Sequence, residues 1–160
     1  MMLSMALECV ILVGLPGSGK TTFYRQHLGA GYEHVSKDLF PHARSRQGRQ
    51  DALLHAALSR GRSVVVDNTN ASPAERAAII AIARQHGARV VGHYIEASTR
   101  EAVARNEQRE GREKVPKVAI FACAKRLVPP SAEEGFDELR WWRVSGPGTF
   151  EEAAPRPPAS

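Results

Sequence analysis

The feature that most constrains this chain is a glycine-rich loop that directly follows an apolar run near the N-terminus. Residues 9–13 read CVILV, and residues 14–21 read GLPGSGKT. The stretch matches the pattern G-x-x-x-x-G-K-[ST] at every fixed position, between an expected strand and an expected helix. Glycines let successive backbone N–H groups turn inward, so such a loop can surround the phosphates of a nucleotide. We therefore expect a buried strand that ends in a phosphate-binding loop.

Short apolar runs alternate with helical stretches along the rest of the chain. Three of the expected strands are near-continuous runs of Val, Ile and Leu, which is typical of strands buried on both faces of a parallel sheet. Gly61 and Gly87 follow two expected helices, where a left-handed residue ends a helix. The pattern predicts an α/β fold, a P-loop NTPase with a five-stranded parallel sheet and helices on both faces. The expected strands are 8–13, 33–35, 63–66, 89–95 and 139–144, and the expected helices are 19–28, 47–60, 73–86, 99–109 and 116–127.

The length of 160 residues is that of one domain. We expect a single domain over residues 1–150 and a disordered tail over residues 151–160, because EEAAPRPPAS is rich in proline and has no apolar pattern. No apolar run approaches the roughly 20 residues that span a bilayer, so no membrane association is expected. The apolar N-terminus lacks the basic start of a signal peptide. We expect Cys9 and Cys123 to be buried reduced thiols and not a disulfide or a metal-binding pair. Together with the missing signal peptide, reduced thiols predict a cytoplasmic protein.

The formal charge of +5 and the pI near 9.6 favour a polyanionic partner. An arginine-rich composition can equally reflect the base composition of a genome. The charge therefore indicates a partner only if basic residues gather at the site.

The loop predicts how a nucleoside triphosphate and Mg²⁺ bind. Lys20 is expected to reach the β- and γ-phosphates, and the Thr21 hydroxyl to lie on Mg²⁺. Asp67 ends the apolar run SVVVD and is expected to orient the same ion. The alternatives are a glycine turn before an ordinary helix and an aspartate in a simple turn. The loop residues expected to bind ATP or another NTP are Gly14, Pro16, Gly17, Ser18, Gly19, Lys20, Thr21 and Thr22.

Transfer of a phosphoryl group needs a base near the attacking hydroxyl and cations over the phosphates. Asp38 follows the second expected strand and could accept the proton, or it could pair within its loop with Lys37 or Arg44. The basic run RNEQREGREK, residues 105–114, surrounds a single glycine and predicts a lid over about residues 105–116. The alternative is a solvated charged face. The lid cations expected to contact the nucleotide are Arg105, Arg109 and Arg112.

Five blocks, taken in order, resemble the 5′-kinase domain of polynucleotide kinases, a branch of the small P-loop kinases related to adenylate kinase. They are GLPGSGKTTF, HVSKD, VVVDNTN, RNEQREGREKVP and PSAEEGFDEL. The first block is shared by many families, whereas the last three are more specific together. The resemblance implies an adenylate-kinase-like fold in which a small basic lid closes over ATP.

By this resemblance, Asp38 is the general base that activates the 5′-hydroxyl of a nucleic-acid end, and Arg109 stabilises the transferring phosphoryl group. Asp67 would hold Mg²⁺ or orient Asp38. The sequence departs from phage-type members at Pro41, where they have an arginine that holds the acceptor's phosphate. The residues expected at the acceptor side are Asp38, Arg44, Arg46, Arg49, Asp67, Asn68 and Asn70.

The sequence therefore predicts a Mg²⁺-dependent kinase that moves the γ-phosphoryl group of ATP to a hydroxyl, with the 5′-OH end of DNA or RNA as the expected acceptor. Lys20, Asp38 and Arg109 are its expected catalytic residues. Two alternatives stay open: a nucleoside or other small-molecule kinase on the same fold, and a non-catalytic or hydrolytic NTP-binding module. DNA against RNA, ATP against GTP, and the oligomeric state are left undecided.

Overall fold

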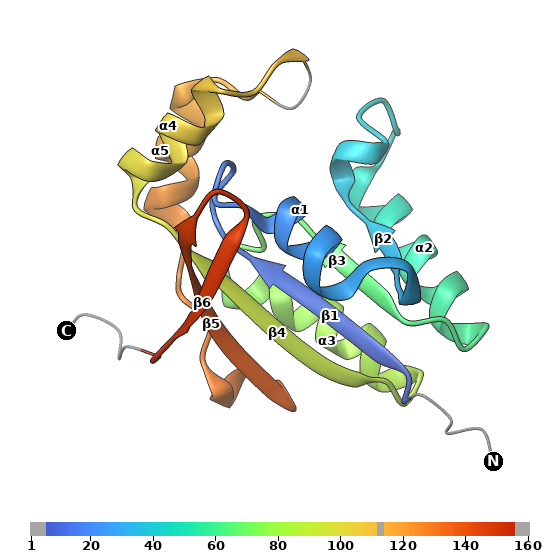
Figure 1. The fold of residues 1–160 in the computed structure, drawn as a ribbon. Helices are drawn as coiled ribbons and strands as arrows, with labels where there is room; N and C mark the ends of the chain where they lie inside the picture. Colours follow the sequence, from blue (N-terminus) through green and yellow to red (C-terminus); the bar gives the residue numbers. More distant parts are fainter. Residues whose placement is uncertain (1–5, 112–113, 156–160) are drawn as a thin grey trace.

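The computed structural model describes residues 6–111 and 114–155, and within them the chain forms one mixed sheet of six strands (Figure 1). The strand order is β2-β3-β1-β4-β5-β6. The first five strands are parallel, and β6 runs antiparallel to β5. The strands are β1 (Glu8–Val13), β2 (Glu33–Val35), β3 (Val64–Asp67), β4 (Arg89–Glu96), β5 (Glu138–Gly146) and β6 (Thr149–Ala153).

The sequence predicted five strands, whereas the sheet has a sixth, β6. It forms a hairpin with β5 through a turn at Gly148, which has φ 68°. Residues 151–153, expected in a disordered tail, belong to this strand. An edge strand pairs on one side only, and β6 has three exposed and two half-buried residues, so its apolar signal is too weak to read from sequence. Residues 156–160 of the expected tail lie outside the described residues.

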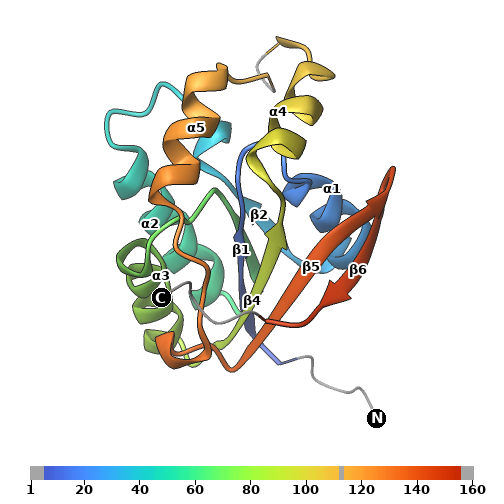
Figure 2. The same ribbon diagram turned by 90° about the vertical axis from the view of Figure 1, so that its left-hand side faces the viewer.

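Helices cover both faces of the sheet, as expected (Figure 2). Helices α2 and α3 lie on one face, and α1 lies on the other. The expected helix 19–28 changes type after one turn, because residues 24–28 form a π-helix. Gly61 and Gly87 follow their helices at φ 76° and 70°, as the sequence predicts. The helices are α1 (Lys20–Phe23), α2 (Arg46–Ser59), α3 (Pro73–Gln85), α4 (Thr99–Glu107) and α5 (Lys117–Arg126).

The core is made of two layers that meet at the central strand β1. Cys9, Ile11 and Val13 face the α2–α3 layer, whereas Val10 and Leu12 face the α1 layer. This alternation explains why the run CVILV is apolar throughout. Burial also raises the pKa of the Cys9 thiol to about 12, so it stays protonated. Both cysteines are free thiols, with Cys9 buried and Cys123 half-buried.

The block PSAEEGFDEL serves the fold. Glu134 accepts two hydrogen bonds, of 2.7 and 2.9 Å, from Arg76, which is fully buried on α3. Phe136 packs on Gly92 of β4 so closely that a Cβ there would lie 2.6 Å from the ring. The segment therefore clamps α3 to the sheet.

Helices α4 and α5 pack side by side at the carboxyl end of the sheet (Figures 1 and 2). Their shared cluster contains Leu15 of the glycine loop, Ala102 and Ile120. The buried Asn106 holds the segment between the helices, because its side-chain amide bonds both the N–H and the C=O of Val115, at 2.9 and 2.6 Å. Among the described residues, no helix is both long and apolar enough to cross a membrane.

Candidate active site

The glycine loop, residues 14–19, connects β1 to α1 and is enclosed by two other elements. Gly17 has φ 85°, and a Cβ there would lie 2.5 Å from the Ala102 carbonyl of α4. Gly19 has φ 106°, and a Cβ there would lie 3.3 Å from the ring of Phe150 on β6. Both positions thus combine a left-handed backbone with close contact, which favours glycine. The loop lies between α4 and the β5–β6 hairpin.

The Lys20 side chain is held at this loop. Its Nζ donates hydrogen bonds of 2.9 Å to the carbonyls of Gly14 and Leu15. Lys20 is only 8% exposed, and burial lowers its pKa, while the Asp67 carboxylate offsets part of this effect and the nearby Arg109 adds to it. The loop therefore carries a buried lysine beside an acid and a second cation.

Thr21 and Asp67 are brought together, as expected for a magnesium site. Asp67 ends β3 and is 5% exposed, and its Oδ2 accepts a 2.9 Å hydrogen bond from the Thr21 hydroxyl. The Nε2 of His34, on β2, lies 2.8 Å from the same oxygen. Burial alone would raise the pKa of Asp67, but the His34 hydrogen bond and the Lys20 charge outweigh it, so the pKa is lowered and the carboxylate stays ionised.

These oxygens fit Mg²⁺, which takes few protein ligands and completes its shell with water and phosphate oxygens. Among the described residues, no cluster of three or more His, Cys, Asp or Glu side chains forms a metal site made of protein ligands alone. Thr21 and Asp67 would hold Mg²⁺ here. Sequence reasoning missed His34, whose only signal is its place in the strand that pairs with β3.

Asp38 follows β2 and lies in a short 3₁₀ turn formed by residues 37–39. Its side chain is 91% exposed, and it pairs at 3.5 Å with Arg46 at the start of α2. The expected alternative partners were Lys37 and Arg44. Arg44 and Arg49 are also exposed in the segment that follows the Asp38 turn.

The two asparagines after β3 have different surroundings. The Oδ1 of Asn68 accepts a 2.9 Å hydrogen bond from the backbone N–H of Lys37, which joins β3 to the Asp38 turn. Asn70 is 4% exposed with φ 48°, and its amide donates to the carbonyls of Leu12 and Val66 at 2.7 and 3.3 Å. Both amide donors of Asn70 are used inside the fold, which argues against the expected contact with the acceptor.

The expected lid corresponds to the end of α4 and the segment that follows. The guanidinium of Arg105 lies 3.4 Å from the carbonyls of Gly17 and Ser18 and 3.7 Å from Glu101. Arg109 follows α4 close enough to Lys20 to affect its pKa. Two of the three expected lid cations thus lie at the loop, and Arg112 lies outside the described residues.

A cleft of about 570 Å³ opens beside the loop, between α4 and the β5–β6 hairpin. Its lining includes Gly19 at the end of the loop and Thr22 in the first turn of α1. The sequence showed Arg105 and Thr22 as candidates here, but the hairpin wall was missed together with β6. The lining residues are Gly19, Thr22, Arg105, Gln108, Val144, Ser145, Gly146, Pro147, Gly148 and Phe150.

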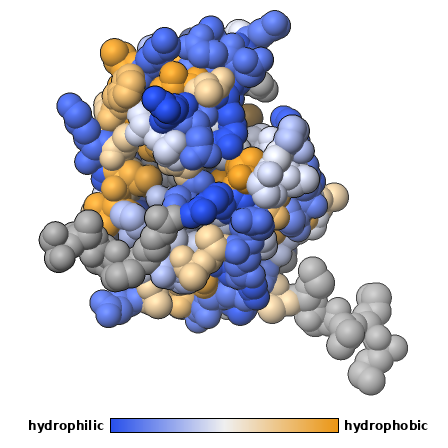
Figure 3. Space-filling model, turned by 60° about the vertical axis from the view of Figure 1, so that its left-hand side comes forward, coloured by the Kyte–Doolittle hydropathy of each residue, from blue (hydrophilic) through white to orange (hydrophobic). Residues whose placement is uncertain are grey.

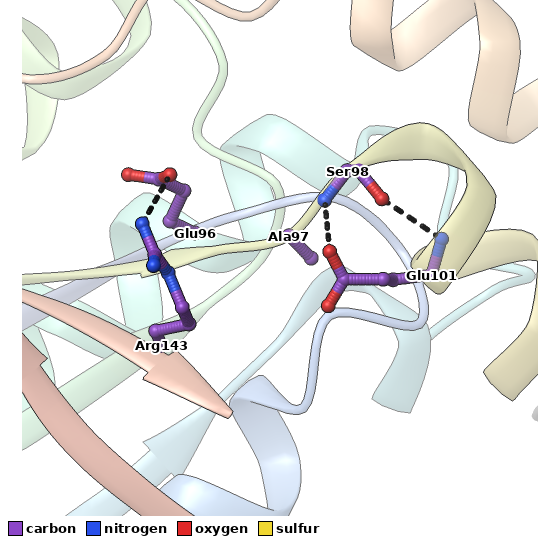
Figure 4. A pocket seen from close by; sticks show the side chains of 5 residues that line it. All are labelled: Glu96, Ala97, Ser98, Glu101 and Arg143. Atoms are coloured by element: carbon purple, nitrogen blue, oxygen red, sulfur yellow. Dashed lines mark hydrogen bonds and ion pairs between the residues drawn. The ribbon is translucent and has the colours of Figure 1, made fainter. Parts of the chain in front are cut away.

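A smaller cavity of about 290 Å³ lies next to this cleft, at the start of α4 (Figure 4). Its polar groups bond one another: Arg143 pairs with Glu96 at 3.4 Å, and Ser98 and Glu101 form a reciprocal capping box. The capping box fixes where α4 begins and hence where Arg105 lies.

A family model described as an AAA domain matches residues 9–130, more than half of the chain. The chain belongs to this family. A bifunctional polynucleotide phosphatase/kinase of Schizosaccharomyces pombe is 32% identical over 136 residues, which cover 82% of this chain and 32% of the relative. A protein of Acanthamoeba polyphaga mimivirus with a name of the same kind is 31% identical over 141 residues, again 32% of its length. The chain thus spans about a third of these homologues.

Solved structures place this AAA domain in the P-loop kinase fold. A fungal RNA kinase superposes with a TM-score of 0.67 at 18% identity, covering 89% of this chain and 40% of that one. A gluconokinase from Sinorhizobium meliloti 1021 superposes with a TM-score of 0.62 at 18% identity, covering 88% and 85%. These likenesses show the fold, and they include proteins named for polymer and for small-molecule substrates. Family and homologues together make the chain a kinase-family P-loop protein.

Proposed function

We propose that the chain transfers the γ-phosphoryl group of ATP to the 5′-hydroxyl end of DNA or RNA. The observation that carries the proposal is the position of Asp38, a carboxylate that is 91% exposed and follows the strand next to β3, which ends in the buried Asp67 bonded to Thr21. A base that must take a proton from a hydroxyl needs access to that hydroxyl, and Asp38 is open to solvent with Arg46 beside it. Such an open, basic side suits the end of a polymer better than a small molecule, which needs an enclosed pocket.

The proposed roles follow from where the groups lie. The loop amides and Lys20 bind the phosphates, and the cleft beside Thr22 receives the nucleoside. Mg²⁺, held by Thr21 and Asp67, would neutralise charge on the β- and γ-phosphates. The oxygen of the acceptor hydroxyl bonds the γ-phosphorus while Asp38 accepts the proton of that hydroxyl. The bond between the γ-phosphorus and the bridging oxygen of the β-phosphate breaks, and ADP is released.

The lid arginines complete this arrangement. Arg105 and Arg109 lie on the loop side, where they stabilise the negative charge of the transferring group. Because phosphoryl transfer has a loose transition state, positioning and charge stabilisation account for most of the rate. Arg46 and its neighbours Arg44 and Arg49 are proposed to hold the acceptor's phosphates, in place of the arginine that Pro41 replaces.

One assay tests the proposal. The protein is given γ-labelled ATP with Mg²⁺ and, in parallel, single- and double-stranded 5′-OH oligonucleotides of DNA and RNA, nucleosides, gluconate and water. Label on an oligonucleotide end supports the proposal. Label only on a nucleoside or gluconate would show a small-molecule kinase, and release of phosphate alone would show a hydrolytic module.

A further inference from the structure

Asn68 links the two halves of the proposed active site. Its Oδ1 accepts from the backbone N–H of Lys37, the residue before Asp38. Its Nδ2 donates a 2.7 Å hydrogen bond to the Oε1 of Gln50 on α2. Because Asn68 follows Asp67 directly, this one side chain connects the metal-binding end of β3, the Asp38 turn and helix α2.

The chemistry of these groups permits one orientation of the two amides. The N–H of Lys37 can only donate, so Asn68 must present its oxygen to it. The NH₂ group of Asn68 then faces Gln50, which must accept with its own oxygen. Gln50 is 2% exposed, so a lost partner could not be replaced freely by water. The three groups therefore form a directional chain with no second arrangement.

Helix α2 anchors this chain to the core. Gln50 and Arg46 are four residues apart and lie on the same face of the helix. Arg46 pairs with the Asp38 side chain, while Gln50 reaches the backbone of the same turn through Asn68. One turn further, Leu54 is fully buried in the α2–α3 layer. Gln50 is thus placed by a packed helix.

We propose that Gln50 is a positioning residue for the phosphoryl transfer. Through Asn68 it holds the 37–39 turn, and hence Asp38, at a set distance from Thr21 and Asp67. The inference rests on the proposed function and extends it to a residue that touches neither nucleotide nor acceptor. Its physical basis is that a general base displaced by a fraction of an ångström to an ångström loses much of its effect.

The test compares Gln50→Met with Gln47→Met. The first substitution keeps the length of the side chain and removes the acceptor, whereas Gln47 is exposed on the same helix and bonds only Asp51 at 2.8 Å. The measured quantity is the ratio of the rate of phosphate transfer to a 5′-OH oligonucleotide to the concentration of ATP-binding sites, which a nucleotide titration gives. This ratio does not change with the fraction of folded protein, so a purely structural role would leave it constant.

We expect Gln50→Met to lower the ratio about tenfold and Gln47→Met to leave it unchanged. Asn68→Ala should lower it at least as much, and the double variant no further than Asn68→Ala alone, because Gln50 acts through Asn68. If Gln50→Met does not fold by circular dichroism, Asn68→Ala carries the test.

An unchanged ratio in the folded Gln50→Met protein overturns the inference, as do additive losses in the double variant. If Gln50→Met does not fold, a wild-type ratio in Asn68→Ala overturns it. A wild-type protein that labels no oligonucleotide overturns the proposed function, and this inference with it.

Discussion

The two aspartates of the proposed site, Asp38 and Asp67, have opposite environments. Asp38 is 91% exposed beside one arginine, whereas Asp67 is 5% exposed and bonded by Thr21 and His34. A buried, ionised carboxylate suits a metal, and an exposed one can exchange a proton with an incoming group. We take this contrast in environment as the basis for assigning different roles to two chemically identical side chains.

Replacing Asp38 by Asn should reduce transfer to an oligonucleotide by a factor of 10² or more, because the amide cannot accept the proton. Binding of ATP should change little, since Asp38 is proposed to take the acceptor's proton and not to hold the phosphates, although its charge does act on Lys20. Transfer rates and nucleotide titrations measure the two effects. Asp51→Asn, on α2, is the matched control and should behave as wild type. Normal turnover by the Asp38 variant would remove this residue from the mechanism.

Replacing Asp67 by Asn should raise the Mg²⁺ concentration needed for half-maximal transfer by about tenfold, because a neutral amide holds a divalent cation less strongly. Chelating all divalent cations should abolish transfer in the wild-type protein. A magnesium titration at saturating ATP measures the shift. An unaltered magnesium requirement would place the ion elsewhere.

His93 is expected to make the protein less stable in acid. It is buried on β4, where its Nδ1 accepts a 2.9 Å hydrogen bond from Trp142, and burial lowers its pKa from 6.5 to about 4. Between these values the unfolded chain binds a proton that the folded protein does not. The free energy of unfolding therefore does not depend on His93 titration above pH 6.5, and it falls by about 3 kcal/mol as the pH drops from 6.5 towards 4.

Urea denaturation at several pH values tests this. His93→Asn keeps an acceptor for Trp142 but does not titrate, so its unfolding free energy should fall less steeply with acid. His42→Asn, at an exposed position, should follow the wild-type curve. Parallel curves for the wild-type and His93→Asn proteins would disprove the assignment.

At the level of elements, the blocks that mark the family divide into those that serve chemistry and those that serve the fold. The glycine loop and the Asp38 turn present groups to ligands. The segment 130–139 instead clamps α3, and Asn106 of the lid block holds the chain between α4 and α5. A motif that marks a family can therefore specify the architecture that carries a site without touching the substrate.

Replacing Glu134 by Ala should lower the free energy of unfolding by about 3 kcal/mol, because it leaves the buried Arg76 guanidinium without its carboxylate. The neighbouring Glu133→Ala, at an exposed position, should change stability little. Urea denaturation measures both. A small effect of Glu134→Ala would show that Arg76 is satisfied by the Asn70 carbonyl, which it also bonds at 2.9 Å.

The sequence predicted most of the elements because their signals are local. The continuous apolar runs, the Ser72-Pro73 start of α3 and the glycines after α2 and α3 each depend on neighbouring residues. For the proposed site, a motif in the sequence identified Lys20, Thr21 and Asp67 as candidates, and the structure brings these three residues together. The partners supplied by distant segments were not: His34, Gln50 and Phe150 reach the site only through strand order and helix packing, which no local pattern encodes.

On the scale of the whole molecule, charge is distributed unevenly around the site. Arg44, Arg46 and Arg49 are all exposed in the segment that follows the Asp38 turn, whereas many other arginines pair with acids along the sheet and α3. On the face where α4 and α5 lie, hydrophilic side chains dominate with apolar ones among them (Figure 3). Part of the net charge of +5 thus lies in the segment where a polyanion is proposed to bind.

Salt should therefore weaken binding of the acceptor more than binding of the nucleotide. With up to three phosphate contacts, the KM for a single-stranded 5′-OH oligonucleotide should rise about tenfold between 50 and 200 mM salt. Steady-state kinetics at the two concentrations measures this, and the KM for ATP is the internal control. Equal salt effects on both substrates would contradict an arginine-lined acceptor side.

The two outer strands of the sheet also bear on how copies of the chain meet. Strand β2 has three residues, and β6 exposes Glu151 and Glu152 along the opposite edge. A very short strand and a charged one are both poor templates for pairing with a strand of another molecule. The architecture that places the hairpin beside the cleft thereby also guards the protein against edge-to-edge aggregation.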